Sequence, residues 1–183
     1  MLDNNAAPGR VNIQPDRLIA DEVLAPDFVK RVLYPYASKS CVYVTGATFF
    51  QAMGAAPALR AELAIPVSCY IDDTGHFNSV EFNICYNQML YLLLAHGVAS
   101  QRIPALGHWT LQSFFEKQLP SILIGRFASR FLRPINPRSF RGTIELEPQS
   151  NRSARALFLN TRAYYTDAGG GAADGEITIS IME

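Results

Sequence analysis

The chain has no excess charge of either sign and lacks the motifs of several familiar enzymes. Sixteen Lys and Arg side chains balance sixteen Asp and Glu side chains. A nucleic-acid-binding protein needs a basic face to displace counterions from phosphates, so the charge balance argues against a nucleic-acid partner. No G-x-S-x-G or H-E-x-x-H motif occurs, and the three histidines, His76, His96 and His108, are far apart. We therefore expect neither a nucleophile-elbow hydrolase nor a local metal site, and we predict no cofactor.

Cysteines and long apolar runs are also scarce. Cys41, Cys69 and Cys85 are odd in number and form no C-x-x-C, which excludes a disulfide framework and favours buried free thiols in a reducing compartment. The longest apolar run covers residues 89–95, far short of a membrane span, and the N-terminus has no secretory pattern. We expect a soluble, cytoplasmic protein that does not interact with a membrane.

The 183 residues are 49% apolar, enough for one domain with a sizeable core. Residues 1–17 are polar, with Pro and Gly, and we predict a flexible N-terminal segment there, followed by a single domain over 18–183. Helical spacing of apolar residues over 18–33 predicts two short helices, broken at Pro26 and with Asp27 as the cap of the second.

Residues 78–97 predict a long helix. Asn78 followed three positions later by Glu81 forms a capping box, and Gly97 with the preceding His96 is typical of a helix end. Between these marks the sequence is apolar nearly all round over 89–95, so we expect the helix to be buried.

The other periodic segments read as strands or as a short helix. A second, short helix is expected at 110–119. Strand patterns, separated by turn residues, cover 41–50, 62–71, 121–132, 140–147, 154–166 and 176–182. Sequential antiparallel strands after one buried helix predict an α+β fold of the hot-dog type, in which a curled antiparallel sheet wraps a long central helix.

The start of the predicted helix is the first candidate site. Free N–H groups and the positive end of the helix dipole collect there, and they would polarise a thioester carbonyl or stabilise an oxyanion. His76, Asn78 and Glu81 surround this end. The alternative is a plain capping box beside a turn histidine, and the two interpretations are compatible.

Further polar residues stand near this segment. Asn87 shares a helix face with Asn83 and precedes the apolar part, so the sheet or a ligand must satisfy its amide. Tyr36 and Tyr70 are candidate donors to a carbonyl, or acids and bases if their pKa values drop, although most tyrosines only pack.

Five arginines cluster over residues 126–141: Arg126, Arg130, Arg133, Arg138 and Arg141. On strands they would bind the phosphates of coenzyme A or of a phosphopantetheine arm, or the acidic surface of a carrier protein. A solvated sheet edge is the alternative.

The segments 68–71 (SCYI), 74–78 (TGHFN) and 85–88 (CYNQ), with Glu81 between them, resemble the core of FcoT-type fatty acyl thioesterases. The resemblance extends to 31–36, to 129–137 and to 170–177, and so covers most of the chain beyond residue 30. It implies a hot-dog fold whose site is drawn from two tyrosines and two asparagines, which match Tyr36, Tyr70, Asn78 and Asn87 here. The roles of His76 and Glu81 are our own inference.

The resemblance also implies an activity. Family members add the amine of glycine to an α,β-unsaturated acyl thioester on a carrier protein and then hydrolyse the thioester, releasing an N-carboxymethyl-3-amino fatty acid. Helix N–H groups with Asn78 and Asn87 would polarise the carbonyl, and His76 or Glu81 would act as base. Tyr36, Tyr70 or Arg130 would bind the carboxylate of glycine.

Two other functions remain open at this point: a simple thioesterase acting on fatty acyl groups carried by coenzyme A or a carrier protein, and a non-catalytic acyl-binding protein. A homo-oligomer, dimeric or larger, is implied by the family. Phe114, Phe115 or Leu92 are candidates for closing an acyl tunnel.

Overall fold

The computed structural model describes residues 18–183, and the segment predicted to be flexible, 1–17, lies outside them. The elements follow the chain in this order: β1 (Leu18–Val23), α1 (Pro26–Val32), α2 (Tyr34–Ala37), β2 (Val44–Ala52), β3 (Ala58–Leu63), α3 (Ser79–Ala99), η2 (Pro104–Leu106), α4 (Leu111–Lys117), β4 (Ile122–Arg133), β5 (Phe140–Arg152), β6 (Ala156–Thr166) and β7 (Ala172–Met182).

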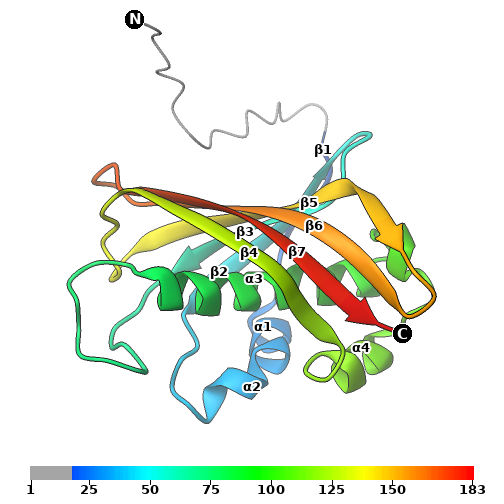
Figure 1. Cartoon of the computed structure of the whole chain (residues 1–183), viewed down its shortest axis with the longest axis horizontal. Helices are drawn as coiled ribbons and strands as arrows, with labels where there is room; N and C mark the ends of the chain where they lie inside the picture. The colour runs from blue at the N-terminus through cyan, green and yellow to red at the C-terminus, as the bar shows by residue number, and fades with distance from the viewer. Residues whose placement is uncertain (1–17) are drawn as a thin grey trace, which may run out of the picture.

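The strands form one sheet of order β1-β2-β3-β5-β6-β7-β4, in which every neighbouring pair is antiparallel. The sheet curls over one side of α3, while α1, α2 and α4 lie on the other side of that helix (Figure 1). This is the α+β hot-dog arrangement, and it confirms the predicted fold class.

The long helix α3 is buried because almost every side of it meets protein. Phe82, Leu92 and Leu93 have no exposed surface, and Met89 packs under the sheet. The close approach at that point requires Gly142 of β5, since a Cβ there would lie 2.5 Å from the Met89 sulfur. Burial of such side chains contributes about 1.5–3 kcal/mol each, so α3 adds substantially to the stability of the core.

Two buried polar side chains of α3 form hydrogen bonds with the segments that surround the helix. The Gln88 side chain, fully buried, accepts from the N–H of Tyr43 at 2.8 Å and donates to the carbonyl of Cys41 at 2.6 Å. The Tyr86 hydroxyl lies 2.7 Å from that of Thr161 on β6. These contacts fix the rotation of α3 about its axis and therefore decide which of its residues face the site.

The helix predicted before Pro26 is wrong. Residues 18–23 form β1, which pairs with β2 at one edge of the sheet. Six residues are too few for periodicity to separate helix from strand, and the unpaired edge of β2 offers hydrogen bonds that an isolated turn of helix lacks. Asp27 is not the cap of α1 either, because Pro26 occupies the first turn and the N-cap is Ala25.

Several predicted boundaries also differ. β2 begins at Val44, β3 covers only Ala58–Leu63, and residues 64–71 form no strand. α3 continues past Gly97 to Ala99. Gly97 is needed instead for packing, because a Cβ there would lie 2.4 Å from the Ile103 side chain.

No helix among residues 18–183 is long and apolar enough to cross a membrane. The cytoplasmic location stays a prediction.

Candidate functional site

The N-terminus of α3 is organised by a reciprocal capping box, as predicted. Asn78 Oδ1 accepts from the backbone N–H of Val80 at 3.0 Å and of Glu81 at 3.2 Å. In return, the Glu81 carboxylate accepts from the N–H of Asn78 at 3.3 Å. The box holds the start of the helix rigidly and keeps its positive dipole end aimed at the neighbouring loop.

Tyr70 joins this group from the loop after β3. Its hydroxyl donates to Asn78 Oδ1 at 2.6 Å. Three donors therefore converge on one oxygen, which fixes the orientation of the amide, because the reverse orientation would place NH₂ against N–H groups. The Asn78 Nδ2 group is left buried, and no residue of 18–183 supplies it with an acceptor. A buried donor without a partner costs about 1–3 kcal/mol, so an acceptor from a ligand would relieve a defect in the free protein.

His76 lies two residues before the cap and is exposed. Its Nδ1 is 3.0 Å from the carbonyl oxygen of Thr74. Because a carbonyl only accepts, Nδ1 carries the proton, and Nε2 of the neutral ring is then free to accept one. His76 therefore has the tautomer that a general base at this place requires.

Glu81 is 97% buried, and its hydrogen bond is to the cap. Partial desolvation, followed by the nearby Glu81 carboxylate, raises the pKa of Tyr70, so this hydroxyl stays protonated at neutral pH and acts as a donor. Burial, with Glu81 as the next cause, raises the pKa of the Cys85 thiol. The geometry makes Glu81 a residue that positions the helix start, whereas His76 faces a cavity.

Tyr36, on α2, and Asn87, on α3, lie away from the start of α3. The ring of Tyr36 packs against Tyr91, with ring centroids 6.3 Å apart. Burial, and next the neighbouring Tyr91, raises the pKa of Tyr36, so it too is a neutral donor. Asn87 is half-buried, and its Nδ2 donates to Asn83 at 3.4 Å. Nine residues separate Asn78 from Asn87, about 13 Å along the helix axis.

The structure thus brings Tyr70 and Asn78 into direct contact and leaves Tyr36, on α2, and Asn87, on α3, farther from the capping box. Arg130 joins neither group. It forms a two-pronged ion pair with Asp174 on β7, at 2.9 and 3.1 Å. Its neighbours Phe127 and Phe131 pack against Phe82 of α3, and because side chains alternate along a strand, Arg130 points to the outer face of the sheet.

The expectation of buried thiols is wrong for Cys69, which is exposed, whereas Cys41 and Cys85 are buried as predicted. Cys69 lies in the loop after β3, where no strand covers it. Among the candidates for closing an acyl tunnel, Leu92 and Phe114 are fully buried and Phe115 is partly buried against the core.

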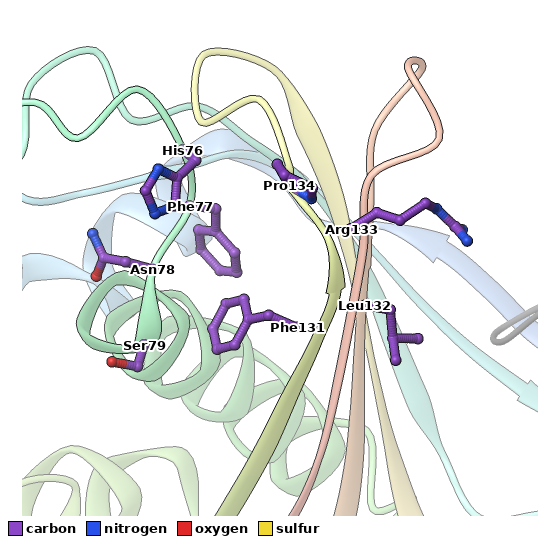
Figure 2. Close-up of a pocket in the computed structure, with 8 residues that line it drawn as sticks. All are labelled: His76, Phe77, Asn78, Ser79, Phe131, Leu132, Arg133 and Pro134. Carbon is purple, nitrogen blue, oxygen red and sulfur yellow. The ribbon is translucent and has the colours of Figure 1, made fainter.

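A cavity of about 380 Å³ lies at this end of α3 (Figure 2). One wall is the segment of His76, Phe77 and Asn78, and the other is the end of β4, with Phe131 and Leu132. Phe77 is held by its backbone N–H, which donates to the carbonyl of Ile135 at 3.0 Å. The cavity has a mainly apolar wall with a few polar groups at one end, which is typical of a binding site for a small organic ligand.

Sequence reasoning missed Phe77, Phe131 and Leu132 as walls of this cavity. Their apolar side chains carry no signal of chemistry, and β4 reaches α3 only in the folded chain. Gln88 was missed as well, although a glutamine within an apolar helix is a usable signal, because a buried amide must find partners.

Within residues 18–183, no group of three His, Cys, Asp or Glu side chains could hold a metal ion. The prediction that the protein needs no cofactor stays a prediction.

Comparison with known proteins places this arrangement in context. A protein of Streptomyces coeruleorubidus named "(2E)-enoyl-[ACP] glycyltransferase" is 44% identical over 168 residues, which cover 90% of this chain and 98% of the relative. A protein of the same name from Mycobacterium marinum is 37% identical and covers 87% of each chain.

Among solved structures, a Thermus thermophilus thioesterase complexed with coenzyme A and Zn has 19% identity and a TM-score of 0.39. It matches 68% of this chain and 78% of its own, a likeness too slight to bear on function. Residues 31–181 match the FcoT-like thioesterase domain, a region that contains the capping box, both tyrosines and the cavity. The chain therefore belongs to the FcoT-like thioesterase domain family.

Proposed function

We propose that the protein adds glycine to the β-carbon of a 2-enoyl thioester on an acyl carrier protein and then hydrolyses the thioester. The product is an N-carboxymethyl-3-amino fatty acid. Support comes from the relatives named "(2E)-enoyl-[ACP] glycyltransferase", which are 35–44% identical over most of the chain.

The observation that carries the chemistry is the Nδ2 group of Asn78, which has no acceptor within residues 18–183. A thioester oxygen that accepts from this group would also meet the positive end of α3. Both interactions strengthen as negative charge grows on that oxygen, which happens when a nucleophile attacks the β-carbon and an enolate forms. The same donor would stabilise the tetrahedral oxyanion of hydrolysis, so one site would serve both steps.

His76 is the base in this mechanism. Nε2 takes a proton from the glycine ammonium, and the neutral amine forms a bond to the β-carbon. The proton returns to the α-carbon as the enolate collapses to a saturated thioester. In the second step water attacks the carbonyl carbon, the carbon–sulfur bond breaks, and the carrier thiol leaves with a proton.

Tyr70 positions Asn78, since its protonated hydroxyl donates to the amide oxygen and so directs Nδ2. Tyr36 on α2 and Asn87 on α3 bind substrate farther from the capping box. Arg130 is held by Asp174 in this structure, so we favour the Tyr36 hydroxyl for the glycine carboxylate.

A homodimer is part of the proposal. β4 is twelve residues long and lies at the sheet edge, where no strand within residues 18–183 pairs with its outer side, and it forms a wall of the cavity. Leu123 and Leu132 on this strand are 45% and 44% exposed, and Val80 on the first turn of α3 is 43% exposed. Pairing with a second copy would cover these side chains and close the open side of the cavity. Light scattering should give at least twice the chain mass of 20.2 kDa, and a monomeric mass at working concentration would refute it.

The decisive experiment is mass spectrometry of reactions with a 2-enoyl thioester, with and without glycine. We expect a new acid with the summed mass of the enoic acid and glycine. A saturated acyl thioester of equal length is the matched control, because it cannot undergo conjugate addition. Release of free enoic acid at a rate indifferent to glycine would refute glycine addition and leave a plain thioesterase. Binding without any turnover would leave an acyl-binding protein.

A further inference from the structure

The five clustered arginines do not share one environment in the folded chain. Arg130 pairs with Asp174, Arg138 with Asp73, and Arg141 with Glu62. Among residues 18–183, no carboxylate lies within salt-bridge distance of Arg126 or Arg133. Two positive charges on β4 are therefore uncompensated.

Arg133 differs from Arg126 in position, because it lines the cavity at the start of α3. Its Nε donates to the carbonyl of Gly170 in the β6–β7 hairpin, which leaves both terminal nitrogens of the guanidinium without a partner within 18–183. Figure 2 shows the side chain running from the end of β4 towards that hairpin, away from Asn78. The guanidinium thus lies at one side of the cavity and Asn78 at the other, with Phe77 and Phe131 between them.

The cavity between these two ends suits a neutral chain. Phe131, Leu132 and Pro134 form its wall on the β4 side, and none of its eight lining residues is acidic. Along the lining the order is the Asn78 amide, apolar side chains and then a guanidinium whose terminal nitrogens have no partner within 18–183. A pantetheine arm matches this order, since it is a long neutral chain with a thioester at one end and a phosphate at the other.

We propose that Arg133 binds the phosphate of the 4′-phosphopantetheine arm, the group that coenzyme A and a loaded carrier protein have in common. A guanidinium presents paired N–H donors that fit phosphate oxygens, and the bond to Gly170 holds it in place. The proposal rests on the proposed function for the identity of the substrate, but the binding of the arm can be measured without any reaction.

The test compares 4′-phosphopantetheine with pantetheine, which lacks only the phosphate, by titration calorimetry. We expect the wild-type protein to bind the phosphorylated arm about tenfold or more tightly, the effect of a hydrogen bond to a charged group. Arg133→Gln should remove this preference without weakening pantetheine, and Arg133→Lys should restore part of it. Arg126→Gln is the matched control, because it removes the same charge from the same strand outside the cavity, and it should keep the preference.

Three results would overturn the proposal: equal binding of both arms by the wild-type protein, equal weakening of both arms in Arg133→Gln, or an equal loss in Arg126→Gln. Turnover measurements distinguish whether Arg133 contacts the phosphate of the arm or the surface of the carrier protein. A defect of Arg133→Gln confined to carrier-bound substrate, with free enoyl-phosphopantetheine unaffected, would assign Arg133 to the carrier's protein surface and refute phosphate binding. If the phosphate preference holds but glycine never enters the product, the proposed function fails and the phosphate site stands.

Discussion

The two ends of α3 belong to one continuous helix and meet opposite surroundings. At the C-terminal end, Leu92, Leu93 and Leu94 have no exposed surface, and His96 contacts Glu22 of β1 at 3.0 Å. At the N-terminal end, Val80 is exposed, Asn78 Nδ2 has no acceptor among residues 18–183, and a cavity opens against β4.

Under the proposed function, this one helix serves stability at one end and chemistry at the other. The closed end buries apolar area, which stabilises the fold. The open end leaves helix N–H groups, an amide and a histidine beside a cavity. Unsatisfied polar groups there lower the stability of the free protein. If this division is right, substitutions at the closed end should change stability but not chemistry, and those at the open end should do the reverse.

The largest effect should come from Leu93→Ala at the closed end. Removing a fully buried leucine leaves a cavity and should lower the free energy of unfolding by about 2–5 kcal/mol, measured by urea titration. Turnover per folded molecule should be unchanged. Leu119→Ala is the control, since Leu119 is 61% exposed and its loss should cost little. A large loss of turnover in folded Leu93→Ala would contradict the division.

At the open end, Asn78→Ser should lower kcat about 10²–10³-fold, the usual cost of losing an oxyanion donor. Serine still caps the helix but has no amide group, so the melting temperature should change little. Asn78→Ala separates the two roles, because it should lose the same activity and also about 0.5–2 kcal/mol of stability. Full activity of the serine variant would show that Asn78 is only a cap.

The smallest effect should come from a substitution of Asp167, whose carboxylate stabilises the backbone beside the open end. Its carboxylate accepts from the N–H of Asn136 and of Gly171, both at 2.7 Å, next to the carbonyl of Ile135 that holds Phe77. These backbone bonds, that of Asn136 first, lower the pKa of Asp167. Because the pKa of Asp167 is lower in the folded chain than in the unfolded chain, its ionised carboxylate stabilises the fold. This contribution is complete above the unfolded pKa of about 3.9 and disappears as the pH falls through the folded pKa.

Asp167→Asn should therefore reduce stability by less than about 1 kcal/mol at pH 7, since solvent screens the carboxylate. Melting temperatures of the variant and the wild type should converge in acid, below both pKa values. A difference that stays constant from pH 7 to pH 2 would mean that the charge contributes nothing.

The same division separates what the sequence can predict from what it cannot. The capping box of Asn78 and Glu81 was predictable because both partners lie within four residues, so the interaction is decided locally. The apolar run over 89–95 likewise predicts burial whatever surrounds it. From these and the strand patterns the hot-dog arrangement follows, and the site at the helix start with it.

Partners far apart in the chain were decided only by the tertiary structure. Residues 18–23 became a strand because β2 had a free edge. Arg130 faces Asp174, whereas Arg133 lines the cavity, because the alternation and bulges of β4 set where each side chain points. Local propensity is a property of a few residues. The pairing of β1 with β2 and the closing of the cavity instead depend on contacts between residues at least 25 positions apart, such as Val23 and Thr48, which no short pattern encodes.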